Sequence, residues 1–146
     1  MVSLTRNEFL TARAWHGAVV GGRDMILRHT SALESLQLFN GYMREKRIDV
    51  YAKQPGEYEN INYRIVDSFD NLGITNYRNV RCTSVNQTIN DMLGDFDNID
   101  EQPLIEALAT YYYLHNDSFN GLEIAPENQA VFNSIKDWAI EYYNED

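Results

Sequence analysis

The chain has 146 residues, of which 44% are hydrophobic and 23% are charged, so its composition excludes a disordered polypeptide and fits one globular domain. Its single cysteine, Cys82, excludes an internal disulfide and a multi-cysteine zinc site. The net charge is −10, yet residues 1–53 hold eight basic and five acidic side chains, whereas residues 54–146 hold four basic and seventeen acidic ones. Because such a surface repels phosphate backbones, we expect the C-terminal part to avoid nucleic acid and to suit a basic partner better.

The sequence gives no sign of membrane attachment. It contains no apolar run close to the roughly 20 residues of a membrane-spanning helix. Its first residues lack the apolar core of a signal peptide. We therefore expect a soluble, cytoplasmic protein.

Two helices are expected in the first part of the chain. Thr5 and Glu8 have the spacing of a capping box, which predicts a helix over residues 6–16. A second helix is predicted over residues 32–39, with Leu33 on its apolar stripe.

The pattern then changes to the two-residue period of strands. Apolar and polar residues alternate in two segments separated by a Pro-Gly turn, which predicts half-buried strands joined as a hairpin. Two further short apolar segments also fit strands. The four predicted strands cover residues 48–53, 61–66, 74–77 and 80–85.

The last part of the chain is predicted to be helical. Ser84 and Asp100 are placed to cap helices that run to about Gly94 and His115. A final helix is expected to start at Pro126. Its apolar stripe is formed by Val131, Ile135, Trp138 and Tyr142, and Phe132 and Ala139 widen it. The order of helices, strands and helices predicts one α+β domain over residues 1–146, with a small mixed or antiparallel sheet, packed helices and a helical C-terminal part.

Metal-binding patterns are incomplete in this chain. Asp95 and Glu106 have the spacing of the first and twelfth positions of a calcium loop. However, Asp100 stands where that loop needs glycine for its sharp turn. We therefore interpret the segment as a solvated acidic connection between two helices and expect no metal site.

An enzymatic alternative starts from Gly21-Gly22 followed by Asp49 on a strand, a pattern that is faintly similar to nucleotidyltransferases. Those enzymes hold magnesium ions with two carboxylates one residue apart, whereas Tyr51 stands at the second position here. The alternative is thus a nucleotidyltransferase-like enzyme with a degenerate site, which would need Asp67 or Asp91 to lie near Asp49.

Nucleophilic catalysis has little support in the sequence. Cys82 lies in an apolar strand and is interpreted as a buried small hydrophobe. The three histidines, His16, His29 and His115, are far apart in the sequence. We predict no catalytic residue and no cofactor, and the sequence leans toward a protein that is not an enzyme.

Tyrosines are abundant, and three of the ten are consecutive at residues 111–113. Adjacent helical positions point about 100° apart, so at least one of these rings should be exposed or lie at a helix seam. Exposed tyrosine favours protein contacts. The interface candidates are Tyr111, Tyr113 and Tyr143, together with the basic residues Arg44 and Arg47.

Three segments carry short motifs that occur together in one protein family. The first spans residues 29–36, where Ser31-Ala32-Leu33 opens a helix; the second is the strand block 48–52 and 61–66; the third spans residues 80–93. Together they resemble the C-terminal domain of AbiEi-type antitoxins, which belong to the type IV toxin–antitoxin systems of bacterial abortive infection. The residues that carry the resemblance are Ser31, Leu33, Ser84, Thr88 and Asp91.

The resemblance implies a non-enzymatic, antitoxin-like or phage-defence protein that acts through protein contacts. Its partner would be a nucleotidyltransferase-type toxin or the target of that toxin. We expect Ser84 to cap a helix, and Thr88 and Asp91 to tie that helix to the sheet as structural markers. The chain departs from the family at Gln87, where a basic residue is common. Only one helix is expected before Val19, so the DNA-binding winged helix usual in the family, and its autoregulation, are not expected. A third interpretation is an acidic adaptor or structural protein of mobile-element origin.

Overall fold

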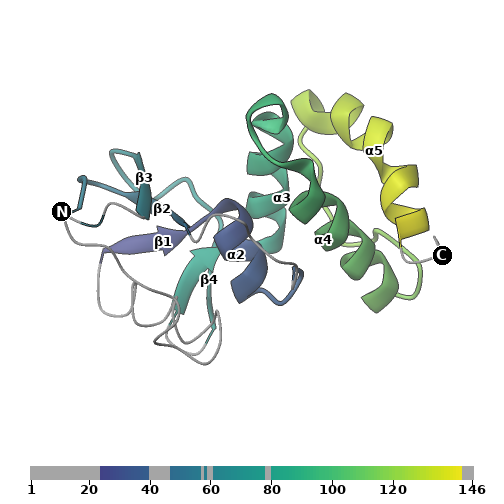
Figure 1. Ribbon diagram of the computed structural model, residues 1–146, viewed down its shortest axis with the longest axis horizontal. Helices are drawn as coiled ribbons and strands as arrows, with labels where there is room; N and C mark the ends of the chain where they lie inside the picture. Colours follow the sequence, from purple (N-terminus) through teal and green to yellow (C-terminus); the bar gives the residue numbers. More distant parts are fainter. Residues whose placement is uncertain (1–23, 40–46, 57, 59–60, 78–79, 143–146) are drawn as a thin grey trace.

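The computed structural model describes residues 24–39, 47–56, 58, 61–77 and 80–142, which form a mixed β-sheet at one end and a group of helices at the other (Figure 1). The α+β class expected from the sequence is confirmed. The predicted helix over residues 6–16 lies outside the described residues. The strands are β1 (Met25–Leu27), β2 (Ile48–Ala52), β3 (Ile61–Ile65), β4 (Ile74–Tyr77) and β5 (Val80–Thr83). The helices are α2 (His29–Ser35), α3 (Val85–Gly94), α4 (Glu101–Leu114) and α5 (Gln129–Glu141), with the short 3-10 helices η2 (Phe96–Asn98) and η3 (Pro126–Asn128).

The five strands follow the order β3-β2-β1-β5-β4. Strand β2 pairs in parallel with β3, with Ile48 opposite Ile61, so the predicted hairpin is wrong. Strand β2 is antiparallel to β1, β1 is parallel to β5, and β5 is antiparallel to β4. Alternation of apolar and polar residues indicates a strand, but it carries no information on the direction of its neighbour.

The two central strands are more buried than their sequence pattern indicates. All five residues of β2 are buried, including Asp49 and Tyr51, although alternation predicted one solvent-exposed face. Strand β1 was not predicted, because three residues are too short to show a period. It nevertheless occupies the centre of the sheet, with Ile26 and Leu27 fully buried.

The apolar core has two parts that meet at α2. Beside the sheet, β1, β2 and β5 contribute Leu27, Val50 and Cys82, among others. In the helical part, α3, α4 and α5 pack around a second group that also includes Leu33 of α2. Helix α2 therefore connects the two, because one of its faces belongs to each cluster. It begins three residues before the predicted start at residue 32 and ends at Ser35, so the predicted end at residue 39 is also wrong.

The buried stripe of α5 agrees with the predicted one except at Trp138. Phe132, Ile135 and Ala139 are buried, whereas Trp138 is 41% exposed. Burial of Phe132 is reinforced by an edge-on contact with the ring of Phe119, from the loop that precedes α5, at a centroid distance of 5.4 Å. The helix is thus rotated so that Trp138 lies outside the core. Within the described residues, no helix has both the length and the apolar character that a membrane crossing requires.

Candidate functional site

The most distinctive polar arrangement lies where β1 ends and α2 begins. Arg28 follows β1 in extended conformation, and its backbone N–H donates to the carbonyl of Asp49 on β2 at 2.9 Å. The backbone N–H of Asp49 in turn donates to Oγ of Ser31 at 2.9 Å. These two bonds attach the start of α2 to β2, so Arg28 and His29 are held at a fixed place beside the sheet.

The side chain of Arg28 is buried, with 8% of the residue exposed. Its guanidinium carbon lies 4.7 Å from the ring centroid of Tyr51, and its Nη2 lies 3.0 Å from Nε2 of His29. Its Nε is buried without a hydrogen-bond partner among the described residues. A buried cation on an aromatic face is stabilised by the ring quadrupole, but that contact leaves hydrogen-bond donors unused.

His29 is held in a left-handed backbone conformation, with φ of +49°, which is uncommon for a residue with a Cβ. Burial and the neighbouring charge of Arg28 lower its pKa below the ordinary value of 6.5. The imidazole is therefore neutral at pH 7, and its Nε2 lies between Nη2 of Arg28 and Oδ2 of Asp95, the latter at 3.1 Å. Without a proton, Nε2 accepts from Arg28 but cannot donate to Asp95; with a proton, it donates to Asp95 but cannot accept from Arg28. Each neutral tautomer of His29 therefore satisfies only one of these two neighbours.

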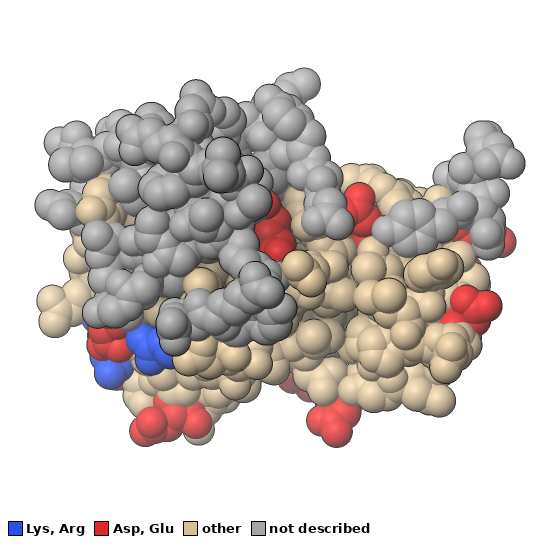
Figure 2. All heavy atoms as spheres, turned by 90° about the horizontal axis from the view of Figure 1, so that it is seen from below, with Lys and Arg blue, Asp and Glu red and all other residues tan. Residues whose placement is uncertain are grey.

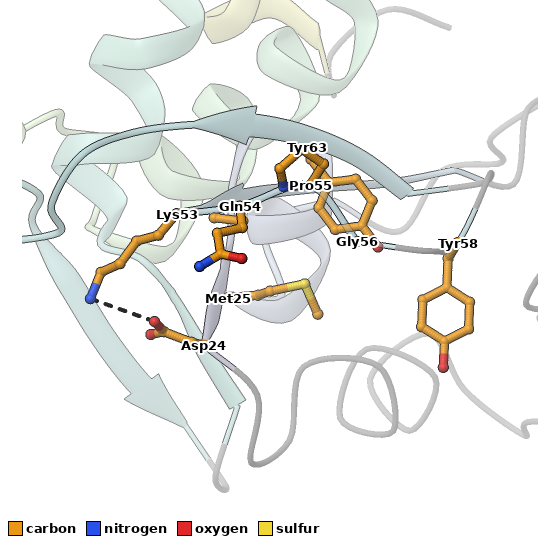
Figure 3. A pocket seen from close by; sticks show the side chains of 9 residues that line it. Asp24, Met25, Lys53, Gln54, Pro55, Gly56, Tyr58 and Tyr63 are labelled. Carbon is orange, nitrogen blue, oxygen red and sulfur yellow. Dashed lines mark ion pairs between the residues drawn. The ribbon is translucent and has the colours of Figure 1, made fainter.

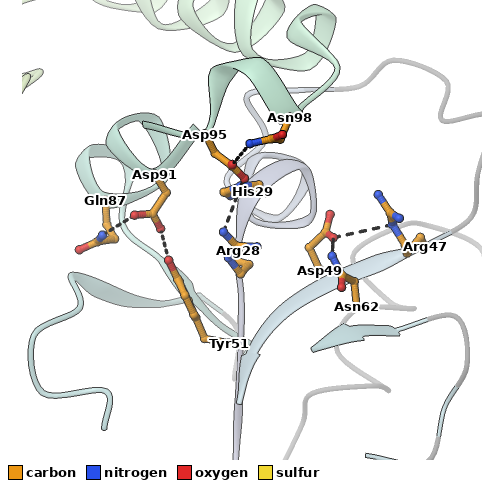
Figure 4. A network of polar contacts seen from close by, with 10 residues as sticks. All are labelled: Arg28, His29, Arg47, Asp49, Tyr51, Asn62, Gln87, Asp91, Asp95 and Asn98. Atoms are coloured by element: carbon orange, nitrogen blue, oxygen red, sulfur yellow. Dashed lines mark hydrogen bonds and ion pairs between the residues drawn. The ribbon is translucent and has the colours of Figure 1, made fainter. Parts of the chain in front are cut away.

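Two carboxylates from α3 and its C-cap face the same region, and both are engaged (Figure 4). Asp91 accepts at Oδ2 from the hydroxyl of Tyr51 at 2.7 Å and at Oδ1 from Nε2 of Gln87 at 2.8 Å. Asp95 accepts at Oδ1 from Nδ2 of Asn98 at 3.0 Å. That bond, followed by the one to His29, lowers the pKa of Asp95.

Tyr51 remains a phenol at neutral pH. Burial, and next its hydrogen bond to Asp91, raise the pKa of Tyr51 above its usual value of 10.0. The phenol therefore donates to the carboxylate and links β2 to α3.

Arg28, Tyr51, Asp91 and Asp95 line a cavity of about 440 Å³. Its walls come from four elements that are distant in sequence: the end of β1, strands β2 and β3, and the C-terminal half of α3. Arg64 of β3, an exposed residue, also lines it. We take this Arg28 cavity as the candidate functional site. Its lining residues are Arg28, Tyr51, Asn62, Tyr63, Arg64, Asp91, Gly94 and Asp95.

A second cavity of about 620 Å³ lies at the other end of β1 (Figure 3). Its charged residues are Asp24 and Lys53, which form an ion pair at 3.5 Å and are about half exposed or more. Met25, Pro55 and the rings of Tyr58 and Tyr63 form much of the rest. This cavity contains no buried charge, so it offers less binding specificity than the Arg28 cavity.

The residues that carry the family resemblance are internal and hydrogen-bonded or packed. Ser84 accepts at Oγ from the N–H of Gln87 at 3.2 Å and caps α3. Thr88, with no exposed surface, has its Oγ1 2.6 Å from Oγ1 of Thr83 on β5. Leu33 packs in the helical core. Ser31, Thr88 and Asp91 thus join α2 and α3 to the sheet, whereas Leu33 belongs to the helical core.

The enzymatic alternative required a second carboxylate near Asp49. Oδ1 of Asp49 accepts from Nδ2 of Asn62 at 3.1 Å and lies 3.8 Å from Nε of Arg47. Asp91 bonds to Tyr51 and Gln87, and Asp67 is exposed in the turn after β3. Within the described ranges, no group of three or more His, Cys, Asp or Glu side chains is placed to hold a metal ion.

The interface candidates fall in different environments. Tyr113 is 72% exposed near the end of α4. Tyr111 is 7% exposed and its hydroxyl donates to the carbonyl of Asn120, so burial removes it from the surface available to a partner. Arg47 is half exposed and lies beside Asp49. Arg44 and Tyr143 lie outside the described residues.

Trp138 is a surface residue, although its helical spacing predicts a place on the buried stripe of α5. Asp137 and Glu141 are exposed on the same helix, one residue before and three residues after the tryptophan. We call Asp137, Trp138 and Glu141 the α5 outer face. On the face drawn in Figure 2, the helical end shows Asp and Glu side chains in red but no Lys or Arg in blue.

Comparison with known proteins adds no assignment. No family model matches the chain, and no curated protein shows significant similarity to it.

Proposed function

We propose that this protein is a non-enzymatic, antitoxin-like protein that acts by binding a protein partner, and that the α5 outer face binds a basic surface of that partner. The observation that carries the proposal is the exposed Trp138 between the exposed carboxylates of Asp137 and Glu141. An aromatic side chain with a polar surround is the usual composition of an interaction hot spot. The carboxylates define the sign of the partner's charge.

Charge over the helical end supports the same proposal. From Asp91 to the end of the sequence, Lys136 is the only cation among thirteen carboxylates. Such an excess attracts a positively charged protein surface and accelerates its association at low salt.

The antitoxin part of the proposal is supported by the sequence resemblance. Ser31, Ser84, Thr88 and Asp91 use their hydrogen bonds to hold α2 and α3 on the sheet. These residues therefore suit a family whose shared positions maintain a scaffold, while the exposed surface provides the contacts with a partner.

Co-expression tests the proposal directly. The wild-type protein is produced in bacteria together with each of several nucleotidyltransferase-type toxins, and growth is measured. We expect it to restore growth against at least one toxin. Unchanged toxicity across the whole panel would contradict an antitoxin role.

Paired variants test the surface. Asp137→Lys, Trp138→Ser and Glu141→Lys together should abolish the rescue, because they remove the aromatic anchor and reverse both charges. The control, Asp67→Lys with Asp70→Lys, reverses two exposed charges in the turn after β3 and should rescue like the wild type. Equal loss in both variants would instead indicate an effect of net charge alone.

A further inference from the structure

The Arg28 cavity has unused hydrogen-bond donors, whereas its carboxylates are already engaged. Both oxygens of Asp91 accept hydrogen bonds, and Oδ1 of Asp95 accepts from Asn98. For Arg28, by contrast, Nη2 lies 3.0 Å from Nε2 of His29, and Nε has no hydrogen-bond partner among the described residues. The donors of Arg28 therefore favour a ligand that accepts hydrogen bonds.

The charge of Arg28 leads to the same conclusion. Residue Arg28 is more than nine-tenths buried, and none of the ion pairs found among the described residues includes it. A buried cation is costly because it has lost water, and an anionic ligand would add counter-charge to that of the nearby Asp95. The planar guanidinium matches the geometry of carboxylate and phosphate oxygens, and Arg64 adds a second cation to the lining.

We propose that the Arg28 cavity binds the carboxylate or phosphate group of a small molecule, with Arg28 as the residue that binds the anion. A volume of about 440 Å³ falls within the range of small-molecule sites and exceeds the size of a single phosphate ion. The ligand therefore carries more than its anionic group, and the largely polar lining suits a polar remainder such as a sugar. This proposal goes beyond the proposed function and does not depend on it, since the cavity and the α5 outer face share no residue.

Three probes distinguish the source of the anion: inorganic phosphate, acetate and adenosine monophosphate. Binding is measured by calorimetry and by thermal unfolding, with sodium chloride at equal ionic strength as the control for screening. We expect saturable binding of at least one probe, with the nucleotide binding more tightly than phosphate if the sugar and base occupy the rest of the cavity. Acetate binding without phosphate binding would assign the site to carboxylates. Stabilisation no greater than that by chloride, for all three probes, would overturn the proposal.

Variants locate the site. Arg28→Met should weaken binding by about tenfold or more, because it removes charge-assisted hydrogen bonds. Arg81→Met removes a cation from β5, where Arg81 pairs with Asp24 at 3.6 Å, and should bind like the wild type. Equal affinity of Arg28→Met and the wild type would overturn the proposal.

A measurement on the wild-type protein covers the case in which Arg28→Met fails to fold. Amide NMR shifts are followed during titration with the probe that binds. We expect saturable changes concentrated at Arg28, Asp91, Gly94 and Asp95, which line the cavity. Changes spread over the basic surface residues, or concentrated at the Asp24 and Lys53 cavity, would contradict the assignment.

Discussion

The two buried threonines between β5 and α3 provide a quantitative test of the scaffold. Thr88 has no exposed surface, and its Oγ1 lies 2.6 Å from Oγ1 of Thr83, 2.7 Å from the carbonyl of Ser84 and 3.1 Å from that of Thr83. Because a hydroxyl has a single proton, Thr88 donates to only one of these three oxygens. When Thr88 donates to a backbone carbonyl, its Oγ1 accepts from the hydroxyl of Thr83. Thr88→Val retains the shape of the side chain but leaves the hydroxyl of Thr83 without this partner. Since Thr83 is also fully buried, the free energy of unfolding should fall by about 1–3 kcal/mol.

A double-mutant cycle isolates the pair. Each single valine variant leaves one buried hydroxyl without its partner, whereas Thr83→Val with Thr88→Val leaves none. The double variant should therefore lose less than the sum of the two singles, by roughly 1 kcal/mol. Urea unfolding followed by circular dichroism gives all four free energies. Thr75→Val on β4, which is only partly buried, is the control and should change stability by less than about 0.5 kcal/mol. Additive losses, or single losses as small as the control, would refute the reasoning.

Three further predictions concern the stability of variants at His29, Ser84 and Leu108. Burial, and next the charge of Arg28, lower the pKa of His29, so the unfolded chain binds a proton that the folded chain excludes. The free energy of unfolding, measured by urea unfolding at successive pH values, should therefore fall as the pH drops below 6.5. His29→Asn, in which asparagine tolerates the positive φ, should flatten this slope. Asp95, whose pKa is lowered from 3.8, adds to the loss only below that pH, so a slope confined to pH below 4 would contradict the assignment to His29. Ser84→Ala should cost about 1 kcal/mol in urea unfolding through loss of the α3 cap, against almost nothing for Ser68→Ala in an exposed turn, and equal effects would contradict the role of the cap. Leu108→Ala, in the middle of the helical core, should cost about 2–5 kcal/mol in the same assay, and a loss below 1 kcal/mol would show that α4 is not packed as described.

The helical part of the fold was predictable because its signals are local. Apolar residues recur at helical spacing over several turns of α3, α4 and α5, and the caps act within a few residues. Ser84 accepts from Gln87, and Asp100 accepts from Gln102, as their positions predict. Even here the box at Ser84 is only half formed, because the side chain of Gln87 accepts instead from the N–H of Gly73 before β4.

The sheet and the Arg28 cavity depend on contacts that local pattern does not contain. The parallel pairing of β2 with β3 is a property of the whole sheet, and the burial of Asp49 and Tyr51 follows from the central place of β2. Arg28 lies in a segment whose apolar residues recur with no clear period, and it precedes His29, which has a rare backbone conformation. Nothing in the sequence indicates that α3 brings Asp91 and Asp95 over it, since more than 60 residues separate them.

Trp138 shows that helical spacing alone does not fix which members of an apolar stripe are buried. Ile135, Phe132 and Ala139 of the predicted stripe are buried in the core that α4 shares, and Val131 and Tyr142 pack against it. Trp138, at the same spacing, is exposed. The consequence is an aromatic residue on the surface, which became the basis of the proposed function.

The most direct test of that function is binding of the purified protein to the toxin whose toxicity it relieves. Calorimetry at low and high salt should give an affinity that falls as salt rises, because charge complementarity contributes to the contact. The variant with the α5 outer face replaced should bind at least about tenfold more weakly, as expected on loss of an aromatic hot spot, while the Asp67 and Asp70 control binds like the wild type. A complex whose affinity is unaffected by salt and by the α5 substitutions, or relief of toxicity with no complex, would contradict the account.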